Sequence, residues 1–303
     1  MPPHITVAVC TRDRCTILME CLDSLAEQDH RQGVEVLVVD NGSLDGTAER
    51  VKERSEAYPL ALRVVREPTP GVAAARNRAL EATEAEIVIF VDDDVTLRPN
   101  FIGVHASAFD DPEVIATGGR ILPVFAEDTA PEIRRVFGEG IGGPASVYDM
   151  GTEPLLIGTD QAISTMPFGA NFAVRRKAAL GAGGFKQTLG WGEKMIPGEE
   201  TDLLLRLSRS GAAIAYVPDA VADHHLLVSR LNAEYHRNWW SGQGRSEVIL
   251  CREPLWLQRT FCLPRIGWLW IKWLIARDRV ERMKLRGQIS RRQGQLAEIL
   301  GLG

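Results

Sequence analysis

Short apolar runs alternate with stretches of helical spacing over the first 120 residues of the chain. The apolar runs are rich in β-branched residues, end at turn residues and lie at 5–10, 34–39, 61–65, 87–91 and about 113–118. Between them, apolar side chains recur with helical periodicity over Thr16–Ala26, Thr47–Ala57 and Val72–Ala82. This alternation predicts βαβ units, and therefore a Rossmann-like, mostly parallel, doubly wound α/β sheet with helices on both faces.

The rest of the chain is less regular. Residues 121–166 contain several prolines and glycines and are predicted to form a long, flexible binding loop. Regular patterns return as a strand at Phe168–Arg175, a helix at Glu200–Arg209, a strand at Ala212–Val217, a helix at 226–246 and two helices over 253–300 that break near Arg277 and Asp278. We therefore expect three parts: 1–120, 121–245 and a helical extension over 246–303.

Charge is unevenly distributed along the chain, whose net charge is −5. Residues 1–225 hold 21 Lys and Arg against 34 Asp and Glu, whereas residues 226–303 hold 14 against 6. The acidic body argues against a nucleic-acid binder, and the basic tail favours contact with an anionic surface. Five cysteines without a CxxC pair indicate a reducing compartment, and the first apolar run is typical of a strand rather than a signal peptide.

The tail is also rich in tryptophan, with six of the seven tryptophans at 239, 240, 256, 268, 270 and 273. Its apolar stretch Phe261–Ala276 is sixteen residues long and contains Arg265 and Lys272. As a helix it would reach roughly 24 Å, short of a ~30 Å hydrocarbon core. The composition predicts a helix in the interface of an anionic membrane. The alternative is that these aromatic side chains cover the protein's own core or form a dimer contact.

Polar residues follow four of the predicted strands at the point where each strand ends. They are Thr11 to Arg14 after the first strand, Asp40 to Ser43 after the second, Arg76 and Asn77 after the third, and Asp92 to Asp94 after the fourth. Because ligands bind at the carboxyl ends of strands in open α/β sheets, these residues predict one shared site. Asp45 fits a role as a turn or N-cap residue equally well.

Two acidic segments and a histidine pair carry the candidate chemistry. Asp92-Asp93-Asp94 places three carboxylates side by side, which costs free energy unless a cation such as Mg²⁺ or Mn²⁺ binds; the alternative is a solvated acidic turn. Acids at Glu199, Glu200 and Asp202 open a helix, where they could cap it or supply a general base. His224 and His225 follow a predicted strand and are candidate metal ligands.

Taken together, these segments resemble a known family. TVAVCTRDR, VLVVDNGSLDGT, PGVAAARN, FVDDD, GANFAVRR, GGF, GEETDLLLRL and PDAVADHH occur in the collinear order of the family-2 inverting glycosyltransferases, which have the GT-A fold. The resemblance covers roughly residues 4–245. It implies a nucleotide-sugar-binding half over 1–120 and an acceptor-binding half over 121–245, followed by the Trp-rich, basic extension.

The resemblance also implies roles for individual residues on the donor side. Thr11 and Arg12 would border the nucleotide, Asp40 would contact its base, Asp45 falls in the following turn, and Arg76 and Asn77 would lie near the base and phosphates. Asp92 and Asp94 are the ends of a DxD motif, with Asp94 the metal ligand and Asp92 and Asp93 nearer the ribose and phosphates. Asn171 falls in a segment that borders the donor sugar and the acceptor.

The catalytic base and the second metal ligand have alternatives. The family's Glu-Asp pair reads Glu199-Glu200 here, so Glu200 takes the position of the base, with Glu199 and Asp202 as alternatives near the donor sugar and acceptor. His224 matches a metal-binding histidine of the family, with His225 as the alternative.

The function that this resemblance implies is sugar transfer from a nucleotide-diphosphate sugar, with UDP or dTDP favoured, to a hydroxyl of a glycan or lipid-linked acceptor. The reaction would be a single, inverting displacement assisted by Mg²⁺ or Mn²⁺, in the cytoplasm or peripherally on the cytoplasmic face of the inner membrane. A sugar-phosphate nucleotidyltransferase or an NAD enzyme is disfavoured because no glycine follows the first strand. The remaining alternative is a degenerate, membrane-associated protein that only binds nucleotide sugars.

Overall fold

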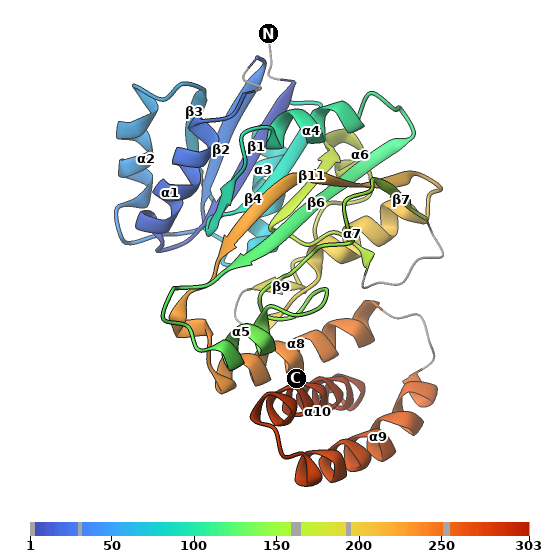
Figure 1. Ribbon diagram of the computed structural model, residues 1–303. Helices are drawn as coiled ribbons and strands as arrows, with labels where there is room; N and C mark the ends of the chain where they lie inside the picture. The colour runs from blue at the N-terminus through green and yellow to red at the C-terminus, as the bar shows by residue number, and fades with distance from the viewer. Residues whose placement is uncertain (1–3, 30–31, 159–164, 192–194, 251–254, 303) are drawn as a thin grey trace.

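The computed structural model describes residues 4–29, 32–158, 165–191, 195–250 and 255–302 (Figure 1). Within these residues, nine strands form one sheet in the order β3-β2-β1-β4-β8-β6-β11-β5, with β7 paired to β11. The strands are β1 (Ile5–Thr11), β2 (Val34–Asp40), β3 (Ala61–Arg66), β4 (Ile87–Asp92), β5 (Val95–Leu97), β6 (Val114–Val124), β7 (Leu155–Ile157), β8 (Asn171–Arg175) and β11 (Ala213–His225).

The first four strands of the sheet are parallel, as the sequence predicts. Thr11 lies opposite Asp40 in the register of β1 and β2, and Cys10 lies opposite Asp92 in that of β1 and β4. The carboxyl ends of these strands are therefore level. The second half is mixed, because β8 runs antiparallel between β4 and β6. Asn171, the first residue of β8, pairs with Val91, so β8 starts at the edge where β4 ends.

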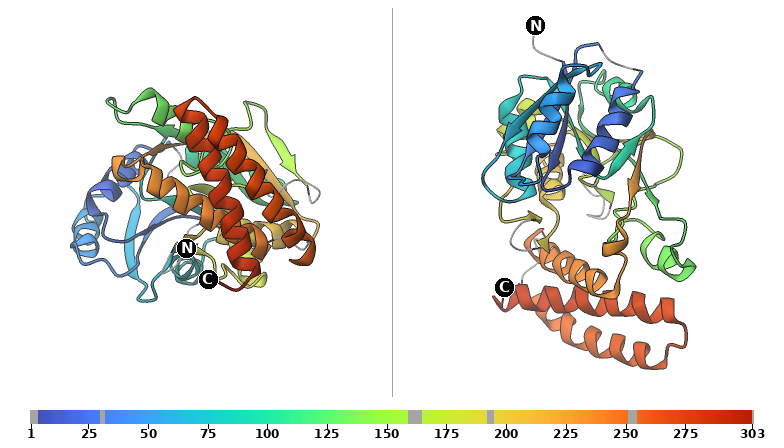
Figure 2. Two further views of the ribbon diagram at one scale, coloured as in Figure 1. Left: turned by 90° about the horizontal axis from the view of Figure 1, so that it is seen from below. Right: turned by 90° about the vertical axis from the view of Figure 1, so that its left-hand side faces the viewer.

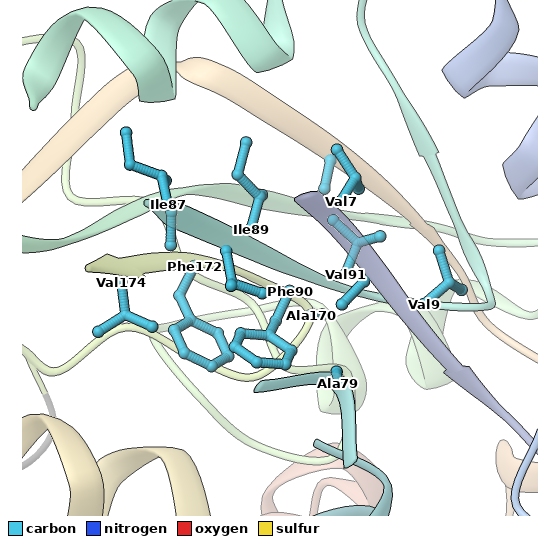
Figure 3. Packing of buried hydrophobic residues seen from close by; sticks show 14 of the residues in the cluster. Val7, Val9, Ala79, Ile87, Ile89, Phe90, Val91, Ala170, Phe172 and Val174 are labelled. Atoms are coloured by element: carbon cyan, nitrogen blue, oxygen red, sulfur yellow. The ribbon is translucent and has the colours of Figure 1, made fainter. Parts of the chain in front are cut away.

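Helices cover both faces of this sheet (Figures 1 and 2). They are α1 (Cys15–Ala26), α2 (Thr47–Ser55), α3 (Val72–Ala82), α4 (Phe101–Ala108), α6 (Arg176–Gly181) and α7 (Glu199–Ser208). The core between sheet and helices consists of the β-branched and aromatic side chains of the strands. Figure 3 shows Phe90 of β4 beside Phe172 of β8, whose rings stack with centroids 5.0 Å apart. This packing rigidly fixes the strand ends that carry the polar residues.

The last strand differs from its sequence prediction in a way that matters for the site. The apolar pattern ends at Val217 because Pro218 and Asp219 follow, yet β11 continues to His225. Its pairing with β6 shifts register between Val217 and Val221, and this irregularity accommodates the proline within the strand. The continuation carries His224 to the end of β6, opposite Pro123.

Some elements were not predicted from the sequence. The segment 121–166 contains the end of β6, α5 (Pro131–Phe137) and β7, and β5, α4 and the two-stranded pair β9 (Gly190–Trp191) and β10 (Met195–Ile196) are also additional. These elements are short or lack clear periodicity, and their stability comes from tertiary contacts rather than from local propensity.

Three C-terminal helices form a separate layer beyond the carboxyl ends of β1 and β4 (Figures 1 and 2). They are α8 (Ala233–Leu250), α9 (Leu255–Ile275) and α10 (Arg279–Ile299), with α10 packed between the other two. A Cβ atom on Gly244 of α8 would lie 1.9 Å from the carbonyl oxygen of Arg291, so α8 and α10 touch backbone to backbone. The predicted break before α10 is present, because the side chain of Asp278 accepts a hydrogen bond from Glu281 N and caps the helix. In the residues that the structure covers, no helix is both long and apolar enough to cross a membrane.

Candidate active site

A large cavity separates the strand ends from the C-terminal helices. Its volume is about 1040 Å³, and it is lined by residues that follow β1 and β4, by the starts of α3 and α7, by His224 of β11 and by side chains of α8, α9 and α10. The predicted residues among them are Thr11, Arg12, Arg76, Asp92, Asp93, Asp94, Glu199, Glu200 and His224. The structure thus brings acids that are distant in the chain together on one cavity.

The acidic triplet is neutralised by arginines in this structure. Arg14 bridges Asp93 and Asp94 at 2.5 and 2.7 Å, and Arg230 lies 3.4 Å from Asp94. Burial and the adjacent carboxylate of Asp94 raise the pKa of Asp93 to about 7, despite the nearby Arg14 and a hydrogen bond from Thr11. Burial also opposes ionisation of Asp94, but His224 and Arg14 outweigh it and lower the pKa of Asp94 below its ordinary value. The surroundings therefore favour the ionised form of Asp94 more strongly than that of Asp93.

Asp94 and His224 face each other across the cavity wall. His224 Nε2 lies 3.4 Å from Asp94 Oδ1, and Nδ1 lies 2.9 Å from the carbonyl oxygen of Ala145. Since a carbonyl only accepts, Nδ1 carries a proton. Burial opposes a positive charge on His224, but the carboxylate of Asp94 outweighs it and raises the pKa of His224 above its ordinary value. His225 points elsewhere, with its Nε2 2.8 Å from Thr96 Oγ1, and it does not line the cavity.

These two side chains fit one edge of a Mg²⁺ or Mn²⁺ site. An imidazole nitrogen oriented by a backbone carbonyl and an ionised carboxylate are suitable ligands, and these cations commonly take few protein ligands alongside phosphate oxygens. Among the described residues, no group of three or more His, Cys, Asp or Glu side chains is arranged to hold a metal ion. The remaining ligands would therefore have to come from a bound substrate and water.

Arg76 of α3 connects the acidic triplet to the start of α7. Its guanidinium forms an ion pair with Glu199 and lies 3.2 Å from Asp92 and 3.9 Å from Glu200. It also donates to the carbonyl oxygen of Gly169 at 3.0 Å. This buried cation therefore holds α3, β4, α7 and the segment before β8 around one point.

Glu200 has the environment expected of a general base. It is 7% exposed, and its Oε1 accepts a hydrogen bond from Gly169 N at 3.3 Å. Burial and the negative charge of Glu199 raise the pKa of Glu200 to about 8, although Arg76 opposes the shift. A carboxylate with a pKa close to the working pH takes up a proton efficiently once ionised.

Two of the predicted donor-binding acids lie beside this cavity rather than in it. Asp40 lines a separate pocket of about 170 Å³ and accepts a hydrogen bond from Ser43 N at 2.8 Å. Asp45 accepts hydrogen bonds from Cys15 N at 2.9 Å and Thr47 N at 3.1 Å, which ties the starts of α1 and α2 together. The geometry of Asp45 is thus that of a turn residue.

Asn77, Asn171 and Asp202 do not line the cavity either. Asn77 hydrogen-bonds both backbone groups of Phe185, at 2.8 Å each. Asn171 is fully buried and contacts His105 and the carbonyl oxygens of Arg120 and Ala220, each at 2.8 Å. Asp202 pairs with Lys186 and Arg206 at 2.6 and 2.7 Å. All three hold neighbouring segments in place.

The cavity also contains residues that sequence reasoning did not assign. Arg14 lies in the polar segment after β1, so its position at a strand end was a usable signal. Arg230 and Tyr235, by contrast, belong to no recognisable pattern before the fold is known. Trp239 and Trp240 line the cavity, which supports the alternative that part of the tryptophan-rich tail packs on the protein's own catalytic body.

Comparison with known proteins identifies the class. Residues 6–180 match the model of glycosyl transferase family 2, so the chain belongs to this family. Over 229 residues it is 30% identical to the pre-mycofactocin glycosyltransferase of Mycobacterium tuberculosis; the match covers 74% of this chain and 43% of that protein. It is 22% identical over 254 residues to the glucosyl-dolichyl phosphate glucuronosyltransferase of Haloferax volcanii, covering 81% of this chain and 77% of that one. The chain thus spans less than half of the first relative.

Solved structures confirm the fold. A mannosyltransferase from Pyrobaculum calidifontis, in complex with GDP-Man and Mn²⁺, has a TM-score of 0.66 at 20% identity and covers 100% of this chain and 89% of its own. TarS of S. aureus, in complex with UDP-GlcNAc, has a TM-score of 0.57 at 17% identity and covers 98% of this chain and 92% of its own. The predicted GT-A fold with a helical C-terminal extension is therefore confirmed.

Proposed function

We propose that the protein transfers a sugar from a nucleotide-diphosphate sugar to an acceptor hydroxyl with inversion at the anomeric carbon. The observation that carries this proposal is the convergence of Asp92–Asp94, Glu200 and His224 on one cavity of about 1040 Å³. Carboxylates, an imidazole and arginines at the carboxyl ends of strands suit a diphosphate and the charge that its departure creates. Membership of the family and the complexes of structural relatives with GDP-Man or UDP-GlcNAc support it.

The donor half of the site is formed by the residues after β1 and β4. Asp94 and His224 would hold Mg²⁺ or Mn²⁺, which when bound neutralises charge on the diphosphate. Thr11, Arg12 and Asp92 lie along the same wall and would border the nucleoside. Arg76 is already paired with three carboxylates, those of Asp92, Glu199 and Glu200. Its role in this proposal is therefore to position Glu200, not to act as a dedicated phosphate-binding group. The donor that we favour is a UDP- or dTDP-sugar, and this preference rests on the sequence resemblance alone, since Asp40 lies outside the cavity and Arg76 is paired with carboxylates.

The acceptor half lies at the start of α7. Glu200 is buried beside the segment 168–170, and its ionised carboxylate would take the proton of the acceptor hydroxyl as that oxygen attacks. The attacking oxygen forms a bond to the anomeric carbon while the bond to the diphosphate breaks, and the proton remains on Glu200. A single displacement of this kind inverts the configuration.

The test is a screen of nucleotide sugars for release of nucleoside diphosphate with Mn²⁺, with Mg²⁺ and with EDTA. We expect slow donor hydrolysis with UDP- or dTDP-sugars that depends on the metal, because water replaces the missing acceptor. A protein that binds UDP without turnover of any donor would instead be the degenerate binding protein. Turnover that is unchanged in EDTA would exclude the proposed role of Asp94 and His224.

We also propose that α9 rests on the surface of an anionic membrane. Its inner face packs through Leu269 against Leu285 and Ile289 of α10. Its outer face exposes apolar side chains, with Trp268 55%, Ile271 60% and Leu274 66% exposed. Lys272 lies 3.9 Å from the centroid of the Trp268 ring, which places a cation beside this apolar face. Trp256 belongs to the part of α9 whose side chains are not described.

Sedimentation with vesicles tests this contact. The chain is expected to sediment with phosphatidylglycerol-containing vesicles at low salt and less well with neutral vesicles. Serine at Trp268 and Ile271 should weaken binding about tenfold or more, because both side chains lose their apolar burial. Leu156→Ser is the matched control, since this leucine is 61% exposed on β7. Equal sedimentation of the Trp268 and Ile271 variant and the control would rule α9 out as the contact.

A further inference from the structure

One face of α8 forms a wall of the cavity next to the start of α7. Helical residues spaced by three and four share a face, and four such residues of α8 line the cavity: Trp239, Gln243, Ser246 and Leu250. We refer to these four as the α8 wall. None of their side chains is charged, so the wall offers apolar contact, an amide and a hydroxyl to a ligand beside it.

The α8 wall is held at a fixed distance from the base. The helix lies between the β9–β10 pair and α10 (Figure 1). A Cβ atom on Gly242 would lie 2.0 Å from the carbonyl oxygen of Met195, so α8 touches β10 backbone to backbone. Only two residues separate β10 from α7, which carries Glu200 in its first turn. Because such close contacts leave no room for sliding, the wall and the base keep one relative position.

Ser246 places a hydroxyl group beside the residues that lead into α7. A Cβ atom on Gly198, two residues before Glu200, would meet Ser246 Oγ at 2.7 Å. The Ser246 side chain is fully buried, and its Oγ has no hydrogen-bond partner in the described part of the chain. A buried hydroxyl without a partner is costly, so this atom indicates a ligand group that forms a hydrogen bond close to the base.

The preceding turns of α8 add a second polar group and aromatic rings. Gln243 Nε2 donates to Glu247 at 3.3 Å, which orients the amide, and the amide oxygen can accept a hydrogen bond. Glu247 is itself paired with Arg291 at 2.6 Å, which balances its charge. The rings of Trp239 and Trp240 meet edge to face with centroids 4.9 Å apart, and both residues line the cavity. This side of the cavity therefore combines hydrogen-bonding groups with apolar ring surface.

The size of the cavity leaves room for a second substrate. Sites for one drug-sized ligand enclose about 300 to 1,000 Å³, and this cavity is at or above that limit at about 1040 Å³. With the donor at the strand ends, the space between Glu200 and the α8 wall remains for the acceptor.

An acceptor with a single hydroxyl does not satisfy this wall. Its hydroxyl would be taken up by Glu200, which would leave Ser246 Oγ without a partner. A sugar ring carries hydroxyls on neighbouring carbons, so that one can face Glu200 while the next reaches Ser246. Its C–H groups form apolar patches, which pack on aromatic rings such as that of Trp239.

We propose that the acceptor is a saccharide whose ring lies against the α8 wall, with one hydroxyl at Glu200 and a neighbouring hydroxyl bound by Ser246. Gln243 binds a further hydroxyl, and Trp239 packs on the ring. The proposal rests on the proposed function and defines the class of its acceptor. Ser246 and Gln243 are then the residues that select a sugar over a simple alcohol.

The experiment measures binding of the methyl glycosides of glucose, galactose, mannose and N-acetylglucosamine by NMR titration, with and without UDP and Mn²⁺. Ser246→Ala is compared with wild type and with Ser208→Ala. The Ser208 hydroxyl on α7 is also buried without a described partner, but it does not line the cavity. We expect at least one glycoside to bind wild type and to bind Ser246→Ala about three- to tenfold more weakly, the contribution of one hydrogen bond. Ser208→Ala should bind like wild type.

Gln243→Ala and Asn238→Ala form a second matched pair. Both residues carry an amide on α8, but Asn238 is exposed and does not line the cavity. Gln243→Ala should weaken binding of the same glycoside, whereas Asn238→Ala should leave it unchanged. The melting temperature of Ser246→Ala should equal or exceed that of wild type, because the substitution removes a buried hydroxyl that has no partner within the described residues.

Two results would overturn the proposal. The first is a wild-type protein that binds none of the glycosides, or binds them no better than cyclohexanol, a six-membered ring with one hydroxyl. The second is equal glycoside affinity of wild type and Ser246→Ala, which would place the sugar away from α8. The first comparison uses wild type alone, so it decides even if a variant fails to fold. Absence of metal-dependent donor turnover would contradict the proposed function without altering these affinities.

Discussion

Replacing Glu200 with glutamine is expected to lower the rate of sugar transfer about 10²- to 10⁴-fold, the usual contribution of a general base. Glutamine preserves the shape of the side chain and can still contact Gly169 N, but it cannot take a proton from the acceptor. The affinity for UDP should stay near that of wild type, because Glu200 lies on the acceptor side of the cavity. The transfer rate is obtained from initial rates at saturating donor, and the affinity for UDP is measured separately, so that the two effects can be compared.

The pH profile offers an independent check on Glu200. The base must be ionised to act, and burial next to Glu199 raises its pKa to about 8. In wild type, kcat/KM should therefore rise with pH up to about 8 and then level, because deprotonation is complete above the pKa of the free enzyme. Glu199→Gln removes the neighbouring negative charge and should move this rise to lower pH. A profile of Glu200→Gln that retains the wild-type rise would assign the base elsewhere.

Asp202→Asn is the matched comparison for Glu200→Gln. Both are acids at the start of α7, and the sequence resemblance favours Glu200 as the base with Asp202 as an alternative. Asp202 is held by Lys186 and Arg206 and does not line the cavity. We expect Asp202→Asn to reduce the thermal stability of the protein while the folded enzyme retains transfer. Loss of turnover as large as that of Glu200→Gln would reverse this assignment.

The parallel half of the sheet could be predicted because a short stretch of sequence is enough to indicate each of its strands. The strands β1, β2 and β4 are short β-branched runs that are buried on both faces, and a polar residue marks the end of each. The level register of Thr11, Asp40 and Asp92 then follows from parallel pairing. The mixed half was less predictable, since Pro218 interrupts the pattern of β11 and only the pairing with β6 carries the strand through to His225.

Which polar residues share the cavity could be predicted only in part, because side-chain direction depends on tertiary contacts. Sequence identified Asp94, Glu200 and His224 as candidates, and they meet in one cavity. The sequence could not distinguish these three residues from Asn77 and Asn171. The side chains of the two asparagines instead form hydrogen bonds with backbone groups of distant segments. The sequence also could not place arginines of α10 opposite the start of α7, since 80 or more residues separate them and no pattern links them.

Replacing Asp94 with alanine is expected to abolish metal-dependent transfer, with a loss of about 10³-fold or more. Asp94 has a lowered pKa, faces His224 Nε2 at 3.4 Å and is contacted by Arg14 and Arg230. Its removal takes away one proposed metal ligand and leaves the guanidinium groups of Arg14 and Arg230, which repel a divalent cation. UDP binding measured with and without Mn²⁺ should show metal-enhanced affinity in wild type and none in the variant.

Substitutions of neighbouring residues on β11 distinguish the loss of a metal ligand from a general disturbance of the structure at the end of the strand. Asp223→Ala removes a carboxylate that pairs with Arg98 at 3.3 Å and does not line the cavity, so Mn²⁺ should enhance UDP binding as in wild type. His224→Ala should weaken that enhancement, whereas His225→Ala should not, because consecutive residues of a strand face opposite sides and His225 is turned toward Thr96. If Asp94→Ala retained the metal effect while His225→Ala lost it, the metal-binding side of β11 would have to be the opposite one, and the cavity could not be where the diphosphate binds.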